Sequence, residues 1–464
     1  MEEINRSYKN IYFIGIGGIG MSNLARYFLL KGYIVGGYDR TETELTNKLT
    51  KEGAFIHFED NPLIIPNEFT DKINTLVVFT PAVPSSHREL KYFKDNDFAV
   101  VKRAQLLGEI TKNSDAICVA GTHGKTTVSS MVAHLFKQSH IDCNAFLGGI
   151  LNNYNSNLLL SEESNFTVVE ADEYDRSFHN LQPHIAIITS ADPDHLDIYG
   201  TEEAYKESFE KFTSLIRPKG HLILKKGANI TPRINDSVKV WSYSETAGDF
   251  HADNIRIGNG EILFDFVSPK GIIKDISLGV PVKINIENGI SAMAAAELSG
   301  ATSDEIKSAM SSFMGVKRRF EFHIKKDNLV YIDDYAHHPE ELKAAIESIK
   351  DLYPNKKLTA VFQPHLFSRT KDFAKQFAES LSLADDVILL DIYPAREEPI
   401  EGVSSQIIFD RITIPNKQLI DKSELLGTII RERPEMLVTF GAGDIDKMVP
   451  HIKKLLSDKL NKEN

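Results

Sequence analysis

The chain has 464 residues, of which 42% are hydrophobic and 25% are charged, and its formal net charge is −12. This is a globular composition, and the length predicts roughly three domains of about 150 residues each. The negative charge argues against broad nucleic-acid binding, which needs a basic face, although backbone amides and a few cations can still hold phosphates.

Cysteine usage and hydropathy indicate the compartment. Cys118 and Cys143 are the only cysteines in the sequence, so no disulfide framework can be derived and a reducing environment is the simpler interpretation. The first ten residues are polar and lack a signal core, and no run approaches the ~18 apolar residues that a membrane span needs. We therefore expect a cytoplasmic protein that binds neither nucleic acid nor membrane, with its oligomeric state left open.

The first 112 residues alternate between strand-like and helix-like patterns. Ile11–Ile14 is a short β-type run, and a glycine cluster and a helical pattern through Leu30 follow it. Further strands are expected at Tyr33–Tyr38 and Thr75–Phe79. Strands that alternate with helices predict a parallel sheet, and hence an α/β domain at residues 1–112.

A second domain is expected at residues 113–315. Its predicted regular elements are strands at Ala116–Ala120, Phe166–Val169 and Ile185–Thr189, with helices from about Thr126 and over about Asn288–Leu298. From His221 to about Val282 the pattern alternates and contains a turn at Asn259-Gly260, which predicts antiparallel strands.

A third domain is expected at residues 316–464. Its predicted strands are Leu329–Ile332, Leu358–Phe362, Asp386–Leu390 and Met436–Phe440, and an amphipathic helix end follows Ile452. The chemically rich clusters of all three domains mostly follow predicted strands. In open α/β sheets ligands bind at the carboxyl ends of the strands, so these clusters can face shared clefts if the domains are suitably oriented.

A glycine motif follows the first predicted strand. Gly15-Ile16-Gly17-Gly18-Ile19-Gly20 fits the pattern G-x-G-x-x-G, and Asp39 lies nineteen residues beyond Gly20. Such glycines let the backbone approach a diphosphate at a helix N-terminus, and the acidic residue can hold a ribose. NAD is the usual ligand, but UDP offers the same two groups, and glycines that serve only a tight turn are the remaining alternative.

Gly121-Thr122-His123-Gly124-Lys125-Thr126-Thr127 has the setting of a phosphate-binding loop, between a strand and a helix. Two residues rather than four separate Gly121 from Gly124, so the spacing departs from the usual Walker pattern. Backbone N–H groups can still hold phosphates, Lys125 can neutralise β and γ oxygens, and Thr126 can ligate Mg²⁺. A purely structural lysine is disfavoured here because the helix dipole is positive at this end.

Two candidates for a metal site follow later strands. Glu170, which precedes Ala171-Asp172-Glu173, can supply a carboxylate to Mg²⁺, and an exposed acidic turn is the alternative. His195 could ligate a second metal, although a lone histidine is more often structural.

Polar clusters also mark the third domain. Lys317-Arg318-Arg319-Phe320-Glu321 is either a solvated basic face or a phosphate clamp at a domain junction. Asp333–Pro339 and Gln363–Thr370 each follow a strand, and Arg369 could hold a carboxylate. A site of three histidines that binds a metal there is a weaker hypothesis.

In combination, these motifs resemble the Mur ligases over essentially the whole chain. The segments that carry the resemblance are Gly15–Ser22, Gly121–Thr127, Glu170–Asp175, His195–Asp197, Gly315–Glu321, Asp333–Glu340, Phe362–Thr370, Tyr393–Ala395 and Gly441–Ile445. The resemblance implies an α/β protein of three domains: an N-terminal Rossmann-like domain that binds a UDP-sugar, a central P-loop-type ATPase domain with added antiparallel strands, and a C-terminal Rossmann-like domain that closes over the amino acid and the nucleotide.

The resemblance also implies roles for individual residues. UDP-N-acetylmuramate would be bound by Gly17, Gly18, Ile19, Gly20, Asp39, Thr80, Pro81 and Ala82. ATP would be bound by Gly121, Thr122, His123, Gly124, Lys125, Thr126, Thr127, Asn285, Asn288, Arg319 and Asp334. The residues linked to Mg²⁺ would be Thr126, Glu170 and His195, and those at the amino acid Tyr335, His337 and Arg369.

The implied activity is an ATP- and Mg²⁺-dependent ligation of L-alanine to the carboxylate of UDP-N-acetylmuramate through an acyl phosphate. The residues expected to carry the catalysis are Lys125, Glu170, His195, His337 and Arg369. Attack requires a free amine, for which His337 or His338 is the candidate base, because a neutral imidazole suits pH 7.

Three positions depart from the family's usual pattern. Ile284 stands where histidine is frequent and Leu366 where arginine is frequent, so a cationic role there falls to Arg369. Val128 replaces a third threonine of the loop, a change expected to be mild inside a helix.

Three alternatives stay open. A ligase that recycles a murein tripeptide onto the same UDP-sugar is disfavoured by Phe362–Thr370, which is typical of alanine addition. An NAD-dependent oxidoreductase leaves the second glycine loop unexplained. A non-catalytic nucleotide-binding scaffold conflicts with the intact Lys125, Thr126 and Glu170.

Overall fold

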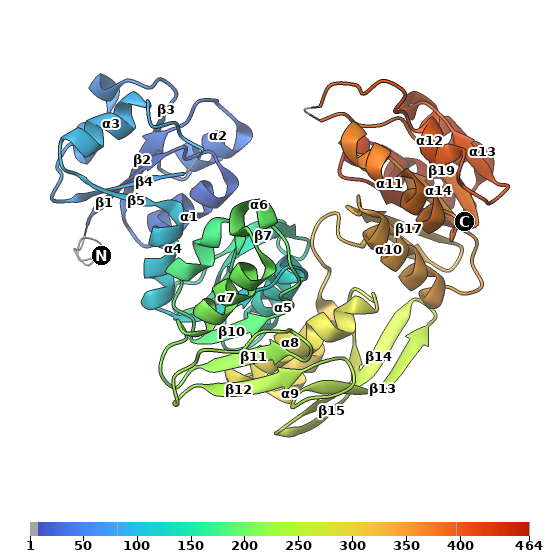
Figure 1. Ribbon diagram of the computed structural model, residues 1–464, viewed down its shortest axis with the longest axis horizontal. Coiled ribbons are helices and arrows are strands. Elements are labelled where there is room, and N and C mark those ends of the chain that lie inside the picture. The colour runs from blue at the N-terminus through green and yellow to red at the C-terminus, as the bar shows by residue number, and fades with distance from the viewer. Residues whose placement is uncertain (1–7, 81, 396, 464) are drawn as a thin grey trace.

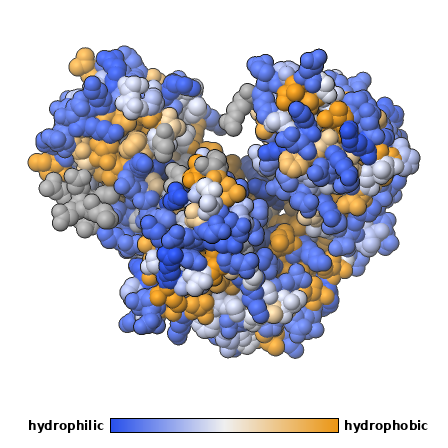
Figure 2. Space-filling model, in the orientation of Figure 1, coloured by the Kyte–Doolittle hydropathy of each residue, from blue (hydrophilic) through white to orange (hydrophobic). Residues whose placement is uncertain are grey.

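The computed structural model describes residues 8–80, 82–395 and 397–463, and it is an α/β protein built around separate, largely parallel sheets. In Figure 1 the blue N-terminal unit and the orange to red C-terminal unit stand apart above a cyan to yellow central unit. The space-filling view shows a hollow between the two upper units (Figure 2). Each described helix falls short of the length and apolar character that crossing a bilayer requires.

The N-terminal unit is a parallel sheet with helices on both faces. Its elements are β1 (Asn10–Ile14), α1 (Ile19–Leu30), β2 (Ile34–Tyr38), α2 (Glu44–Lys51), β3 (Phe55–His57), β4 (Thr75–Phe79), α3 (Arg88–Asp95), β5 (Ala99–Lys102) and α4 (Arg103–Lys112). Alternate residues of β1 face opposite sides, so Ile11 and Phe13 pack with α1 and α4, whereas Tyr12 and Ile14 pack with α3. The strand order is β3-β2-β1-β4-β5, which places the glycine motif after β1 at a topological switch point.

The central unit is a larger sheet that carries the second glycine loop at its middle strand. Its elements are β6 (Asp115–Ala120), α5 (Lys125–Lys137), β7 (Asn144–Leu151), β8 (Ser156–Leu159), β9 (Phe166–Glu170), β10 (Ile185–Ile188), α6 (Leu196–Tyr199), α7 (Glu202–Thr213), β11 (His221–Lys225), β12 (Lys239–Tyr243), β13 (His251–Gly258), β14 (Glu261–Ser268), β15 (Gly271–Ser277), α8 (Ile284–Leu298) and α9 (Ser303–Ser312). In the order β12-β11-β10-β6-β9-β7-β8, β6 lies between the parallel strands β10 and β9. The segments that follow these three strands therefore meet at one sheet edge.

The prediction of antiparallel strands from His221 onward was wrong for its first part. β11 and β12 extend the central sheet in parallel, and only β13, β14 and β15 form an antiparallel sheet among the described residues. β12 is the edge strand and is largely solvent-facing. Its mixture of polar and apolar residues therefore resembles that of a hairpin strand.

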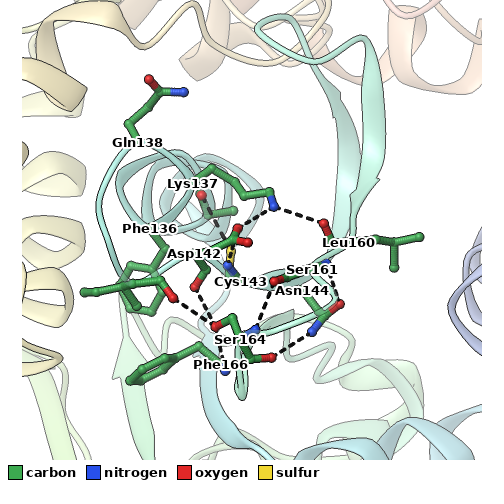
Figure 3. A network of polar contacts seen from close by, with 12 residues as sticks. Phe136, Lys137, Gln138, Asp142, Cys143, Asn144, Leu160, Ser161, Ser164 and Phe166 are labelled. Atoms are coloured by element: carbon green, nitrogen blue, oxygen red, sulfur yellow. Dashed lines mark hydrogen bonds and ion pairs between the residues drawn. The ribbon is translucent and has the colours of Figure 1, made fainter. Parts of the chain in front are cut away.

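A polar network fixes the far end of α5, the helix that follows the second glycine loop (Figure 3). Lys137 at the end of the helix pairs with Asp142 and donates to the Leu160 carbonyl oxygen at 3.0 Å. The Ser164 hydroxyl, next to the start of β9, lies 2.9 Å from the Asp142 carbonyl oxygen. The C-terminal end of the helix is thus tied to the segment between β8 and β9.

The C-terminal unit is a third sheet, in the order β16-β17-β21-β18-β19-β20, with β16 as its antiparallel edge. Its elements are β16 (Glu321–Lys326), β17 (Leu329–Asp334), α10 (Pro339–Leu352), β18 (Leu358–Phe362), α11 (Phe367–Leu381), β19 (Asp386–Leu389), α12 (Gln406–Phe409), β20 (Lys417–Leu419), α13 (Leu425–Glu432), β21 (Met436–Phe440) and α14 (Val449–Glu463). The four strands predicted here are confirmed to within two residues at their ends.

The predicted Asn259-Gly260 turn joins β13 to β14 and touches the C-terminal unit. The Gly260 N–H donates to the Leu352 carbonyl oxygen, at the end of α10, over 3.1 Å. Gly260 has a φ of +74°, and a Cβ there would lie 2.4 Å from the Tyr353 hydroxyl oxygen. Glycine is therefore required both by the turn and by the contact.

His134, on α5, is a buried histidine whose protonation opposes folding. It is 1% exposed, and its Nδ1 and Nε2 lie 3.1 Å from the Tyr154 hydroxyl and 3.0 Å from the Ser312 hydroxyl. Burial lowers the pKa of His134 to about 4, below the ~6.5 of an unfolded histidine. Between these two values the unfolded chain binds more protons, so stability is lost as the pH falls, by up to ~1.4 kcal/mol per pH unit.

We expect His134→Gln to weaken this loss of stability between pH 6.5 and 4. The measurement is the urea midpoint of the central unit across that range, in the variant and in the unmodified chain. His451→Gln, which removes an exposed histidine of α14, serves as the control, and its urea midpoint should change with pH as steeply as that of the unmodified chain. The same pH dependence of the midpoint in all three proteins would contradict the assignment.

Candidate active site

The loop between β6 and α5 passes so close to the segment after β10 that Gly121 admits no side chain. Gly121 has a φ of +147°, and a Cβ there would lie 2.0 Å from Thr189 Oγ1 and 2.9 Å from the Ser190 backbone nitrogen. Gly124 caps α5 in the left-handed region, with φ +84°. The first N–H groups of a helix lack partners within it, so the loop and helix together offer donors and a positive dipole end to a phosphate.

The remaining loop residues are held by the segment that follows β10. The Thr122 hydroxyl donates to the Asp192 carbonyl oxygen at 2.7 Å and lies 2.9 Å from the Tyr205 hydroxyl. The His123 N–H donates to Ser190 Oγ at 2.9 Å. The loop is thus fixed before any ligand binds.

Lys125, the first residue of α5, folds back over its own loop. Its Nζ donates to the Gly121 carbonyl oxygen and to Glu173 Oε1, both at 2.7 Å. Burial raises the pKa of Glu173 above its ordinary value, while Lys125 opposes this rise. The lysine charge is therefore placed directly at the phosphate loop and is shared with one buried carboxylate.

Thr126 and Glu170 form the oxygen-rich corner of the site. The Thr126 hydroxyl donates to Glu170 Oε1 at 2.9 Å, and the Gly148 N–H donates to Glu170 Oε2 at 3.0 Å. Burial raises the pKa of Glu170, and its hydrogen bond with Thr126 opposes the rise. A hydroxyl beside a carboxylate fits Mg²⁺, which prefers oxygen ligands and keeps waters and phosphate oxygens in its remaining positions.

His195, the third predicted metal-linked residue, lies beside Glu173 instead of Glu170. Its Nε2 is 3.9 Å from Glu173 Oε1 and 3.7 Å from Asp194 Oδ2. Its backbone is left-handed, with φ +52°, at the start of α6. The structure thus places the Thr126 hydroxyl against Glu170, whereas His195 lies next to Glu173.

A cavity of about 1010 Å³ extends from this corner to the C-terminal unit. Its lining includes the predicted nucleotide residues Thr122, His123, Gly124, Lys125, Thr126, Thr127, Asn285, Asn288, Arg319 and Asp334. Asn288 donates to Asn285 Oδ1 at 3.0 Å, and both lie on the first turns of α8 beside Ile284, which is 57% exposed. The cavity therefore also offers an apolar residue and amide groups from α8.

Asp334 and Arg319 line this cavity from the C-terminal unit. Asp334 accepts hydrogen bonds from the Phe320 and Ala336 N–H groups, each at 2.7 Å. Burial raises the pKa of Asp334 to about 6. Arg318 forms an ion pair with Asp333 at 3.0 Å. Arg319 lines the cavity, so of these two arginines it is the one placed to contact a ligand.

Tyr335, His337 and Arg369 gather on the C-terminal unit. The Tyr335 and His337 rings are 5.2 Å apart, with the Arg319 guanidinium 5.4 Å from the Tyr335 ring centre. His337 Nδ1 lies 3.0 Å from the Tyr335 carbonyl oxygen, which only accepts, so the neutral ring carries its proton on Nδ1 and its lone pair on Nε2. Burial lowers the pKa of His337.

Arg369 and His338 differ in the contacts that their side chains make. Arg369 Nη1 is buried without a hydrogen-bond partner in the part of the chain that the structure describes, and its charge contributes to the lowered pKa of His337. A buried guanidinium nitrogen of this kind suits a carboxylate ligand. His338 instead precedes α10 and packs its ring against Phe373 at 4.9 Å.

A second cavity, of about 490 Å³, lies between the N-terminal and central units. Its lining includes the predicted sugar-nucleotide residues Gly18, Ile19, Gly20, Thr80 and Ala82. Asp39 accepts from the Gly17 N–H at 2.7 Å and so closes the glycine loop from behind, while Pro81 lies outside the described residues. Glu170 lines this cavity and the larger one, so the two meet at its carboxylate.

Two residues of the site escaped the sequence interpretation. Arg103, the first residue of α4, lines the smaller cavity, and its guanidinium lies 3.1 Å from where a Cβ on Gly20 would be. Its position directly after a strand was the available signal. Glu173 stood inside a quoted motif, but only the fold shows that it contacts Lys125.

Family models match nearly the full length of the chain. They are described as the Mur ligase family catalytic domain at residues 10–115, the Mur ligase middle domain at residues 119–296, and the Mur ligase glutamate ligase domain at residues 318–443.

Individual relatives agree with these models. UDP-N-acetylmuramate–L-alanine ligase of Parabacteroides distasonis is 61% identical over 97% of this chain and 98% of its own length. The enzyme of the same name from Flavobacterium johnsoniae is 50% identical over 97% and 99%. A solved UDP-N-acetylmuramate-alanine ligase from Thermotoga maritima superposes with a TM-score of 0.75 and 26% identity, covering 98% of this chain and all of that one. The three family models together cover the three units of the fold, and the chain therefore belongs to the Mur ligase family.

Proposed function

We propose that the chain is an ATP-dependent ligase that joins L-alanine to the lactyl carboxylate of UDP-N-acetylmuramate in the synthesis of peptidoglycan precursors. The observation that carries the proposal is the position of Glu170, which lines both the sugar-side and the nucleotide-side cavity. A carboxylate held in one cavity and the γ-phosphate of ATP held in the other would meet beside it. The names of the relatives that share 50–61% of their residues with this chain support the same reaction.

The reaction proceeds in two transfers. An oxygen of the substrate carboxylate attacks the γ-phosphorus of ATP, the bond to the bridging oxygen breaks, and ADP leaves with that electron pair. The amine of L-alanine then attacks the carbonyl carbon of the acyl phosphate, and inorganic phosphate leaves as the amide forms. Neither transfer needs a covalent nucleophile on the protein, since positioning and charge neutralisation suffice.

The phosphate end of the site neutralises charge. Lys125 and the loop amides hold the β- and γ-phosphates, and Arg319 approaches from the C-terminal unit. Thr126 and Glu170 are the residues that would hold Mg²⁺, with His195 as an outer partner, and the ion would supply charge neutralisation at the transferred phosphoryl group. Asn285 and Asn288 face the adenine and Asp334 the ribose.

The two organic substrates occupy opposite ends of the site. The first glycine loop, Asp39, Thr80 and Ala82 hold the UDP-sugar, and Arg103 adds a cation near its diphosphate. Arg369 pairs with the carboxylate of L-alanine, with Tyr335 and His337 beside it.

We assign residues 1–112 to the UDP-sugar domain, 113–315 to the ATP domain and 316–464 to the closing domain. A cytoplasmic location follows from the proposed substrates, since ATP and nucleotide sugars are cytoplasmic metabolites. A tripeptide-recycling ligase is the second candidate, and hydride transfer from NAD is the remote one.

The deciding measurement is phosphate release with ATP, Mg²⁺ and UDP-N-acetylmuramate, with L-alanine, a murein tripeptide or neither added. We expect release that depends on L-alanine and a product with the mass of the alanyl conjugate. Dependence on the tripeptide would move the chain to the recycling activity, and no release in any mixture would reject the ligase proposal.

Lys125→Ala removes the cation at the phosphate loop. We expect turnover to fall by about 10²- to 10³-fold, the scale of losing one preorganised charge at a developing anion. Binding of UDP-N-acetylmuramate, followed by calorimetry, should stay unchanged because the sugar cavity is formed by other residues. Near-normal turnover would reject the phosphate-loop assignment.

His337 is the expected base for the alanine amine, because its Nε2 carries the lone pair and burial lowers its pKa from the ordinary ~6.5. The acidic limb of the pH–rate profile should therefore lie below pH ~6.5 and be lost in His337→Asn. His338→Asn is the matched control, since that ring packs on Phe373, and it should retain the limb. An unmoved limb in both variants would exclude a histidine base here.

A further inference from the structure

Glu173 is a buried carboxylate that the proposed chemistry does not use. Its side chain is 2% exposed, and its Oε1 lies 2.7 Å from the Lys125 ammonium, whose side chain is 16% exposed. Its Oε2 is buried with no hydrogen-bond partner in the described part of the chain. A carboxylate in such a place is costly unless a cation compensates it, and Lys125 is the cation in closest contact.

The backbone of Glu173 is fixed independently of Lys125. Its carbonyl oxygen accepts a hydrogen bond from the Tyr199 hydroxyl at 2.5 Å and from the Arg176 N–H at 3.0 Å. Tyr199 itself is buried at 5% exposure. The buried carboxylate therefore extends from a fixed backbone and contacts the ammonium at the end of the flexible lysine side chain.

This attachment decides which protons of the lysine remain for a ligand. An ammonium group has three N–H donors. One goes to the Gly121 carbonyl oxygen and one to Glu173 Oε1. The third faces the Thr122 carbonyl oxygen at 3.5 Å, which is a long and weak contact. It is therefore the donor that a phosphate oxygen can take over, and the two shorter contacts define its position.

We propose that Glu173 is a positioning residue that holds the Lys125 ammonium in the geometry needed for phosphoryl transfer. The same carboxylate places a negative charge next to the phosphates. The inference rests on the proposed function, because it takes Lys125 as the residue that contacts the phosphates of ATP. Two opposite effects follow. The charge of Glu173 repels ATP and weakens its binding, whereas the ordering of Lys125 speeds the transfer.

Glu173→Gln separates the two effects, because it keeps the size of the side chain and removes its charge. We expect ATP to bind at least ~3-fold more tightly by calorimetry in EDTA, since one negative charge has left the neighbourhood of the phosphates. We expect kcat to fall by ~10-fold or more, because a neutral amide holds the ammonium less firmly. A merely structural role would not move the two quantities in opposite directions.

Asp142→Asn is the matched control. It removes the acidic partner of Lys137, at the other end of the same helix (Figure 3). Both ATP affinity and kcat should stay within about twofold of the unmodified chain, the scatter expected of a change that does not touch the site.

Glu173→Asp keeps the proposal testable if the glutamine variant does not fold. It retains the charge and draws the carboxylate back by one methylene, so kcat should fall while ATP affinity in EDTA stays within about twofold. Any other combination of affinity and kcat in the folded variant overturns the assignment. Calorimetry of ATP needs no turnover, so failure of the ligase activity in the unmodified chain is distinguishable from failure of this inference.

Discussion

The whole site depends on the close approach of two chain segments at the carboxyl edge of the central sheet. Because β6 lies between β10 and β9, the loop that leaves β6 must pass against Thr189 and Ser190 on one side and Glu170 on the other. A Cβ at Gly121 would meet Thr189 Oγ1 at 2.0 Å, so glycine is what allows the passage. The Thr122 hydroxyl and the His123 N–H then fix the loop by donating hydrogen bonds to the same segment, and α5 carries Lys125 and Thr126 from that fixed start.

A protein with a net charge of −12 must hold two highly anionic substrates, and it does so locally. Glu170 and Glu173 are each paired with a loop residue, through Thr126 and Lys125. The cations Arg319 and Arg103 reach the cavities from the neighbouring units. The attraction for phosphate therefore arises from placed donors and a helix end, and the sign of the overall charge has little bearing on it.

Much of the fold could be predicted from the sequence because buried parallel strands are short, apolar and bounded by glycine or polar residues. β4, β18 and β21 coincide with their predicted spans. β12 was misjudged because a solvent-exposed edge strand mixes polar and apolar residues as a hairpin strand does, and the parallel pairing of β11 with β10 and β12 depends on the sheet order. For the site, the loops were readable from local spacing, whereas the pairing of Lys125 with Glu173, 48 residues apart, depends on the sheet order and could not be derived from spacing. The position of His195 beside Glu173 depends on the same long-range packing.

The contact of the Asn259-Gly260 turn with the end of α10 has a mechanical consequence. The C-terminal unit is attached to the central unit by the polypeptide link that enters β16 and also by the Gly260–Leu352 hydrogen bond. A rigid body attached at one point swings in every direction, but one attached at two points turns mainly about the line that joins them. A rotation of the C-terminal unit that keeps both connections would therefore turn Arg319 and Asp334, which line the cavity at the phosphate loop, about one defined axis.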